Sequence, residues 1–135
     1  MIILTESEMN QANSLADIRN NGMTQYLKKP GQNRHQHFIG AKGEIAFARL
    51  FGLTVEMVQK PEGDNGVDFI LDGRSIDVKT TEHQYPKLII RKNKIRSDVY
   101  VLAHSKGNKV ALMGWIKKNT FIDNHKTLIG VEGSP

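Results

Sequence analysis

The sequence predicts an α+β protein, sandwich-like, in which helices flank a mixed or antiparallel central β-sheet. Two amphipathic helical segments come first, and short alternating segments separated by turn residues follow them. Asp72-Gly73 is the strongest hairpin signal, because both residues tolerate the positive φ angles of a tight two-residue turn. Helices followed by a run of strands favour this class over a parallel α/β fold.

The composition is that of one ordinary globular domain, residues 1–135. Hydrophobic residues make up 39% of the chain and charged residues 24%, which is typical of soluble proteins. No apolar run approaches the roughly 18 residues of a membrane span, and Met1–Leu4 is too short for a signal peptide. We therefore expect a cytoplasmic protein. The chain has no cysteine, which excludes disulfides, thiolate metal sites and a thiol nucleophile.

Two helices are predicted in the first part of the chain. Thr5-Glu6-Ser7-Glu8 has the form of a capping box, so a first helix should begin there and end near residues 20–22. A polar, basic loop is expected over Lys28–His37, where proline and glycine interrupt the pattern. A second helix should run from about Phe38 to Phe51, with Gly52 as its C-cap.

Glu44 lies within the apolar face of the second predicted helix. It shares that face with Ala41, Phe47 and Ala48, which follow at helical spacings. A carboxylate in such a position is costly unless it is paired or binds a metal. Glu44 is therefore a candidate site residue, the alternative being a glutamate at the helix edge that reaches solvent.

Short strands and their turns are predicted in the remainder of the chain. The expected strands are Leu53–Val58, Gly66–Leu71, Arg74–Thr81, Lys87–Arg91, Asp98–His104 and Lys109–Ile116. The second and third of these form a hairpin around Asp72-Gly73. The last two form another around Lys106-Gly107-Asn108, in which Trp115 is expected to be a core or edge aromatic, the alternative being an aromatic that stacks on a nucleic-acid base.

The register of the first hairpin brings charged residues together. A two-residue turn pairs Leu71 with Arg74, and the ladder then sets Asp68 opposite Asp77 as a non-hydrogen-bonded pair, with Cβ atoms about 4.5–5.5 Å apart. Lys79 shares their face, because side chains alternate along a strand. Like charges opposite one another destabilise a sheet unless one is protonated or a cation binds both.

A divalent metal fits this charged face. Mg²⁺ takes oxygen ligands and often uses one or two carboxylates together with substrate phosphate. Asp68, Asp77 and the main-chain carbonyl of Val78 form a fitting donor set. Glu44, placed over the hairpin, would direct a third acid to the same centre.

These residues carry a family resemblance. The segment GVDFILDGRSIDVKTT resembles the core motif of the PD-(D/E)XK nuclease superfamily, an acid on one strand followed by acid-any-lysine on the next. GAKGEIAFARLFG is similar to the glutamate-bearing helix that precedes the motif in many members, including archaeal Holliday-junction resolvases. The matching segments cover roughly residues 40–81, and Val67 stands where the motif has proline. The following KLIIRKNKIRSDVYVLAHSKGNKVALMGWIKK looks like small phage-encoded proteins of this type.

The resemblance implies a restriction-endonuclease-like core and phosphodiester hydrolysis. Glu44, Asp68, Asp77 and Lys79 would be the catalytic residues of a Mg²⁺- or Mn²⁺-dependent DNA endonuclease. The metal would be held by Asp68, Asp77 and the Val78 carbonyl, with Glu44 on a second metal or a metal-bound water. Lys79 would orient or deprotonate the attacking water or stabilise charge on the phosphate, with a pKa that such surroundings could depress.

Basic residues flank the acidic centre of a chain whose net charge is +5. Phosphate contacts are expected from Lys42, Lys87, Arg91, Lys92, Lys94 and Arg96. The small size favours selectivity for DNA structure, such as Holliday junctions or other branched DNA. Because resolvase-like enzymes act as homodimers, the resemblance and the size also predict a homodimer here. A phage origin would place the protein in the host cytoplasm. The alternatives are a non-catalytic nucleic-acid-binding module on the same fold, an exonuclease, or an RNA-directed nuclease.

Overall fold

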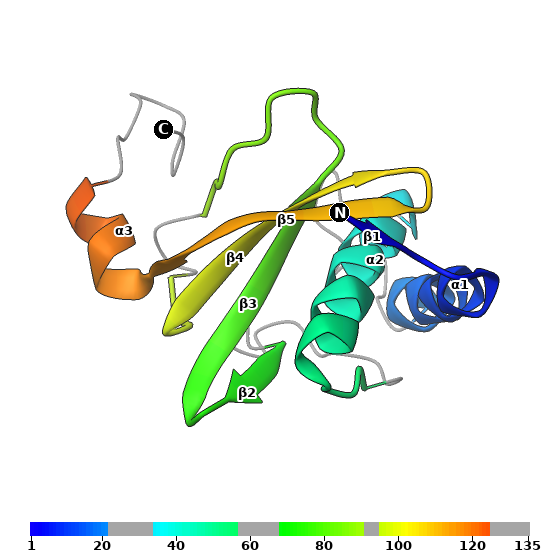
Figure 1. The fold of residues 1–135 in the computed structure, drawn as a ribbon, viewed down its shortest axis with the longest axis horizontal. Coiled ribbons are helices and arrows are strands. Elements are labelled where there is room, and N and C mark those ends of the chain that lie inside the picture. The colour runs from blue at the N-terminus through cyan, green and yellow to red at the C-terminus, as the bar shows by residue number, and fades with distance from the viewer. Residues whose placement is uncertain (22–33, 57–67, 91–94, 125–135) are drawn as a thin grey trace.

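A computed structural model describes residues 1–21, 34–56, 68–90 and 95–124 of the chain. The strands in these ranges are β1 (Ile2–Ile3), β2 (Phe69–Leu71), β3 (Arg74–Thr81), β4 (Val99–Lys106) and β5 (Lys109–Lys117). The helices are α1 (Glu6–Asn21), α2 (Arg34–Phe51) and α3 (Lys118–Asn124). Together the described elements make a mixed α/β fold, in which α1 and α2 pack on one side of the sheet and α3 follows β5 (Figure 1).

The capping box at the start of α1 is confirmed. The Glu8 main-chain N–H donates to Thr5 Oγ1 over 3.1 Å, and the Thr5 N–H donates to Glu8 Oε1 over 2.9 Å. These two bonds satisfy main-chain donors that an uncapped helix start would leave unpaired. The helix ends at Asn21, within the predicted range.

Helix α2 ends where predicted but begins earlier. Its last residue is Phe51, Gly52 has a φ of 68°, and the Leu53 N–H closes the final turn on the Ala48 carbonyl at 2.8 Å. This is the left-handed C-cap that favours glycine. The helix starts at Arg34, so residues 34–37 of the predicted basic loop are helical. The rest of that predicted loop lies outside the described residues.

Both predicted hairpins are confirmed. In the first, Leu71 pairs with Arg74 and Phe69 with Ile76, and both turn residues have positive φ, 52° for Asp72 and 77° for Gly73. That combination is the type I′ pattern that matches the twist of the flanking strands. In the second, β4 and β5 pair around the turn after Lys106.

The sheet is mixed, in the order β1-β5-β4-β3-β2 among the described strands. Strands β3 and β4 are parallel and the other neighbouring pairs are antiparallel. The start of β4 is tied to β3 by Asp98, whose Oδ2 accepts the Ser75 N–H at 2.9 Å and the Ser75 hydroxyl at 3.1 Å. The parallel pair places β3, which carries Asp77 and Lys79, between β4 and the strand β2 at the end of this order.

Two predicted strands are wrong in their described parts. Residues 53–56 and 87–90 form no strand, and the remainder of both predicted segments lies outside the described residues. Their apolar residues are buried all the same: Val55 joins the main core and Ile90 a second cluster. An extended segment can bury alternate side chains without pairing to a neighbouring strand. The alternating sequence pattern therefore predicted strands where the chain is only packed against the core. Strand β1 and helix α3 were not predicted.

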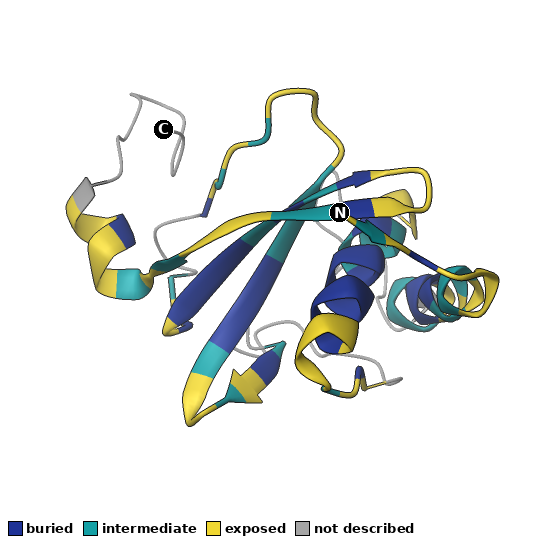
Figure 2. Ribbon diagram, in the orientation of Figure 1, coloured by how far each residue is buried: buried dark blue, intermediate teal, exposed yellow. Residues whose placement is uncertain are grey.

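The core has two parts, one on each face of the sheet. The larger lies between the sheet and helices α1 and α2, where Phe47, Val78 and Val101 pack together (Figure 2). The smaller joins Ile90, Tyr100 and Phe121. Since side chains alternate along β4, Tyr100 projects from the face opposite Val101. No helix in the described ranges has the length and apolar character of a membrane span.

Candidate active site

Asp77 and Lys79 lie on one face of β3, two residues apart. The Lys79 Nζ is 3.0 Å from Asp77 Oδ2, and the aspartate is only 5% exposed whereas the lysine side chain is 42% exposed. Asp77 is level with Tyr100 of the parallel neighbour β4, so it lies on the face of the smaller cluster. The buried carboxylate is thus paired with an amine that still reaches the surface.

The pKa of Lys79 is shifted by opposing influences. Burial acts to lower it, but the carboxylates of Asp77 and, at longer range, Asp68 outweigh burial and raise the pKa above its ordinary value. The amine is therefore an ammonium at neutral pH. The expected depression of this pKa is not found in the protein alone, because two acids face the amine.

Asp68 reaches the same strand just before β2 begins. Its N–H donates to the Ile76 carbonyl over 2.9 Å, and its Oδ2 accepts the Val78 N–H at 2.8 Å. Val78 is the residue between Asp77 and Lys79, so the three charged residues converge on one short stretch of β3. Strand pairing ends at Phe69 and Ile76. Asp68 and Asp77 therefore do not face one another as a pair in the ladder, as predicted, and the Asp68 carboxylate accepts a hydrogen bond from the main chain of Val78 instead.

The donor set fits a hard divalent cation. In a strand the N–H and C=O of one residue point to the same edge, so the Val78 carbonyl faces the side on which Asp68 lies. Two carboxylates and a carbonyl are oxygen donors of the kind Mg²⁺ takes, with water completing the octahedron. Among the described residues no group of three or more acids or histidines could hold a metal. Within the described part of the chain, Asp68 and Asp77 are the acids that this donor set offers.

Glu44 does not join this centre. It is buried on α2, and its two carboxylate oxygens accept from the Arg19 guanidinium of α1 at 2.7 and 2.9 Å. Helix α2 packs on the face of β3 that carries Val78, whereas Asp77 projects from the other face. The structure therefore places Glu44 in an ion pair with Arg19, and its expected role in catalysis and metal binding stays a prediction. Its apolar surroundings demanded a partner, and that partner is an arginine that sequence spacing could not identify.

Lys42 is also not where the sequence analysis expected it. Its side chain is buried, its Nζ donates to the Gly107 carbonyl at 2.8 Å, and the amine lies 4.7 Å from the centre of the Phe38 ring. Burial lowers the pKa of Lys42, with Glu82 acting in the opposite direction. The amine is thus engaged within the protein, and the phosphate contact expected of Lys42 stays a prediction.

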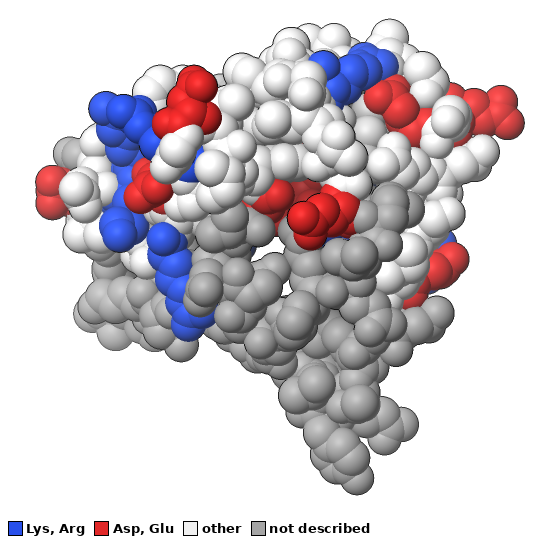
Figure 3. Space-filling model, turned by 90° about the horizontal axis from the view of Figure 1, so that it is seen from below, with Lys and Arg blue, Asp and Glu red and all other residues white. Residues whose placement is uncertain are grey.

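The other predicted DNA-binding residues are either exposed or outside the described ranges. Lys87 and Arg96 are exposed, and Arg91, Lys92 and Lys94 are not among the described residues. Figure 3 shows a face on which Lys and Arg side chains gather at the left, mixed with acidic ones, and further Asp and Glu side chains lie near the middle and at the right.

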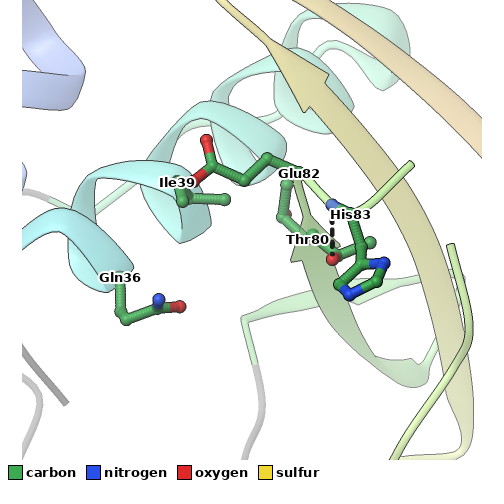
Figure 4. Close-up of a pocket in the computed structure, with 6 residues that line it drawn as sticks. Gln36, Ile39, Thr80, Glu82 and His83 are labelled. Carbon is green, nitrogen blue, oxygen red and sulfur yellow. Dashed lines mark hydrogen bonds between the residues drawn. The ribbon is translucent and has the colours of Figure 1, made fainter. Parts of the chain in front are cut away.

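A pocket of about 350 Å³ lies between the start of α2 and the end of β3 (Figure 4). Its lining is Gln36, Ile39, Thr80, Thr81, Glu82 and His83. The rim is held by the His35–Glu82 contact of 2.8 Å and by the His83 N–H, which donates to Thr81 Oγ1 over 3.1 Å. Glu82 and His83 directly continue the Lys79-Thr80-Thr81 run, so most of the pocket lining lies next to Lys79 in the sequence.

Comparison of the chain with protein-family models, with curated proteins and with solved structures gives no match. The assignment of a function therefore depends on the residues and their geometry. The strongest geometric fact is the convergence of Asp68, Asp77 and Lys79 on the middle of β3.

Proposed function

We propose that the protein is a metal-dependent nuclease of the PD-(D/E)XK type, with a restriction-endonuclease-like core, that hydrolyses phosphodiester bonds in DNA. The observation that carries the proposal is the 2.8 Å bond from the Val78 N–H to Asp68 Oδ2. It brings the first acid to the middle residue of Asp77-Val78-Lys79, as the nuclease motif requires. A structural role alone would not need two acids and an amine around one main-chain unit.

Asp68, Asp77 and the Val78 carbonyl would hold one Mg²⁺ or Mn²⁺. When bound, the ion would supply Lewis-acid activation of the phosphate and a more acidic water. The Asp68 carboxylate is oriented by the Val78 N–H and that of Asp77 by Lys79, so both are held before the metal arrives. Such prior positioning supports tight coordination, because little ordering remains to be done on binding.

Lys79 would contribute positive charge at the scissile phosphate. Its side chain is partly exposed next to the buried Asp77, so its ammonium can donate a hydrogen bond to a phosphate oxygen in which negative charge develops. Exposed Lys87 and Arg96, together with Arg91, Lys92 and Lys94, would contact neighbouring phosphates. Binding should then weaken as salt concentration rises. The small size supports selectivity for branched DNA such as Holliday junctions.

A second candidate is a non-catalytic nucleic-acid-binding module on the same fold. It is favoured by the ion pair between Glu44 and Arg19, which removes the third acid from the centre. In that case the Lys79 ammonium would simply neutralise the buried Asp77 carboxylate. The two candidates differ in whether the protein binds a metal and cleaves DNA through Asp68 and Asp77.

The test compares cleavage of plasmid, linear duplex, single-stranded and four-way-junction DNA in Mg²⁺, Mn²⁺ or EDTA. We expect metal-dependent cleavage that is lost in Asp77→Asn, whereas Mn²⁺ binding by calorimetry weakens in both Asp68→Asn and Asp77→Asn. The matched control is Asp72→Asn, an exposed acid in the turn of the same hairpin, which should retain both properties. Tight DNA binding with no cleavage in any metal would identify the binding module. Full activity of Asp77→Asn would refute the proposed centre.

A further inference from the structure

Tyr100 is the largest fully buried side chain in the described ranges, and it carries a polar group into the smaller cluster. It is 1% exposed, and its ring packs with Ile90 and with Phe121, whose ring centre lies 6.4 Å from its own. The Tyr100 hydroxyl accepts the main-chain N–H of Arg96 at 2.6 Å and that of Ser97 at 3.0 Å. One buried oxygen therefore holds the chain segment that leads into β4.

The same residue lies beside the candidate active site. Tyr100 of β4 is level with Asp77 of β3 in the parallel register, and neighbouring strands are about 4.8 Å apart. Residues that are level with one another in adjacent strands project from the same face, so the phenol ring and the Asp77 carboxylate share the face of the smaller cluster. Lys79 follows on that face of β3. The segment that the hydroxyl holds is thus on the same side of the sheet as the charged centre.

Arg96 is the basic residue that this contact holds. It is exposed, whereas the next residue, Ser97, is fully buried. Asp98 is then bound to β3, because its N–H donates to Ser75 Oγ over 2.8 Å and its Oδ2 accepts the Ser75 N–H. The main chain at Arg96 is therefore fixed on its buried side. Less ordering remains to be done when the side chain of such a residue binds a ligand.

We propose that Tyr100 is a positioning residue, whose hydroxyl holds Arg96 beside Asp77 and Lys79 so that the guanidinium binds a phosphate next to the one that is cleaved. This inference rests on the proposed nuclease function and deepens it. The Tyr100 hydroxyl acts through the main chain of Arg96 and takes no part in the chemical step. Its contribution belongs to DNA binding, where a phosphate contact fixes the register of the substrate.

The experiment is a double-variant cycle of Tyr100→Phe and Arg96→Ala. Tyr100→Phe keeps the ring and removes the oxygen that accepts both N–H groups. In each single variant we expect the KM for cleavage and the Kd for DNA in EDTA to rise about 5–10-fold, and the slope of log Kd against log salt to fall by about 1. The kcat and the Mn²⁺ affinity should stay at the parent values. The double variant should bind DNA no more weakly than Arg96→Ala alone, because both changes remove the same contact.

Two control variants separate positioning from a loss of packing. Ile90→Val and Phe121→Leu remove apolar volume from the same cluster and leave the Tyr100 hydroxyl in place. Both should lower the free energy of unfolding, measured in urea. Both should keep the Kd for DNA and its salt dependence. A change in DNA binding that appears in Tyr100→Phe but not in these variants belongs to the hydroxyl.

The outcomes keep this inference apart from the proposed function. Absence of cleavage by the parent protein in every metal would refute the nuclease. If the parent cleaves DNA, the inference alone fails when the losses of Tyr100→Phe and Arg96→Ala add in full, since the hydroxyl would then support the fold without positioning the arginine. It also fails if Tyr100→Phe lowers kcat while KM stays constant, or if Ile90→Val weakens DNA binding equally. An unchanged salt slope in Arg96→Ala would show that this arginine contacts no phosphate.

Discussion

Lys79 is the residue on which the catalytic proposal can be tested most selectively. Replacing it by methionine keeps the aliphatic part of the side chain but removes the ammonium 3.0 Å from Asp77. We expect Mn²⁺ affinity to be kept or increased, since both carboxylates remain, whereas cleavage falls about 10²-fold or more. Calorimetry and single-turnover cleavage measure the two effects separately. Unchanged turnover would remove Lys79 from the mechanism.

Glu44 should stabilise the fold. Glu44→Ala leaves the largely buried Arg19 guanidinium without its carboxylate, so we expect a loss of about 3–5 kcal/mol in the free energy of unfolding. Urea denaturation measures this loss. The double variant Arg19→Met, Glu44→Leu removes both charges and should recover much of the stability. If Glu44→Ala were instead as stable as the parent but lost metal binding, the catalytic role would have to be restored.

Asp98 makes the stability depend on pH. The main-chain N–H and the hydroxyl of Ser75 lower the pKa of Asp98, with burial acting weakly against them. A lowered pKa in the folded state means that the contribution is present above the unfolded value of about 3.9 and is lost as pH falls through the folded value. Asp98→Asn should therefore be less stable than the parent at pH 7, and the gap should narrow below about pH 4. A gap that is constant across this range would contradict the shift.

The contact between helix α2 and strand β3 depends on one glycine. A Cβ at Gly43 would lie 1.8 Å from Thr80 Oγ1, far inside van der Waals contact, so α2 or Thr80 must move. We expect Gly43→Ala to cost about 1–3 kcal/mol of stability, measured by thermal or urea unfolding. Because Thr80 directly follows Lys79, the shift should also slow any cleavage.

A matched set of variants shows whether that contact is the cause. Thr80→Ala removes the oxygen that the new methyl group would strike, so Gly43→Ala should cost less in that background. Gly40→Ala is the control, since a Cβ at Gly40 meets nothing within 4 Å. Equal losses for Gly43→Ala in both backgrounds would show that helix propensity or another contact is responsible.

Local elements were predictable where a few adjacent residues determine the geometry. The capping box of α1, the glycine end of α2 and both hairpin turns were found as predicted, because each depends on residues within one turn. The segments around Val55 and Ile90 were mispredicted as strands, since burial without pairing leaves the same alternating pattern. The short strand β1 carries no periodicity and could be found only through its partner β5.

The whole molecule shows why the candidate site was only partly predictable. The spacing of Asp77 and Lys79 and the turn at Asp72-Gly73 specify which charges share a face, because strand alternation and turn type are local properties. The order of the strands, the parallel pairing of β3 with β4 and the burial of Lys42 arise from long-range packing. The position of Glu44 also depends on long-range packing. Its apolar helix face indicates that the carboxylate needs a partner, but it does not indicate which residue that partner is. Distant chain segments had to meet before Arg19, rather than a metal, could satisfy it.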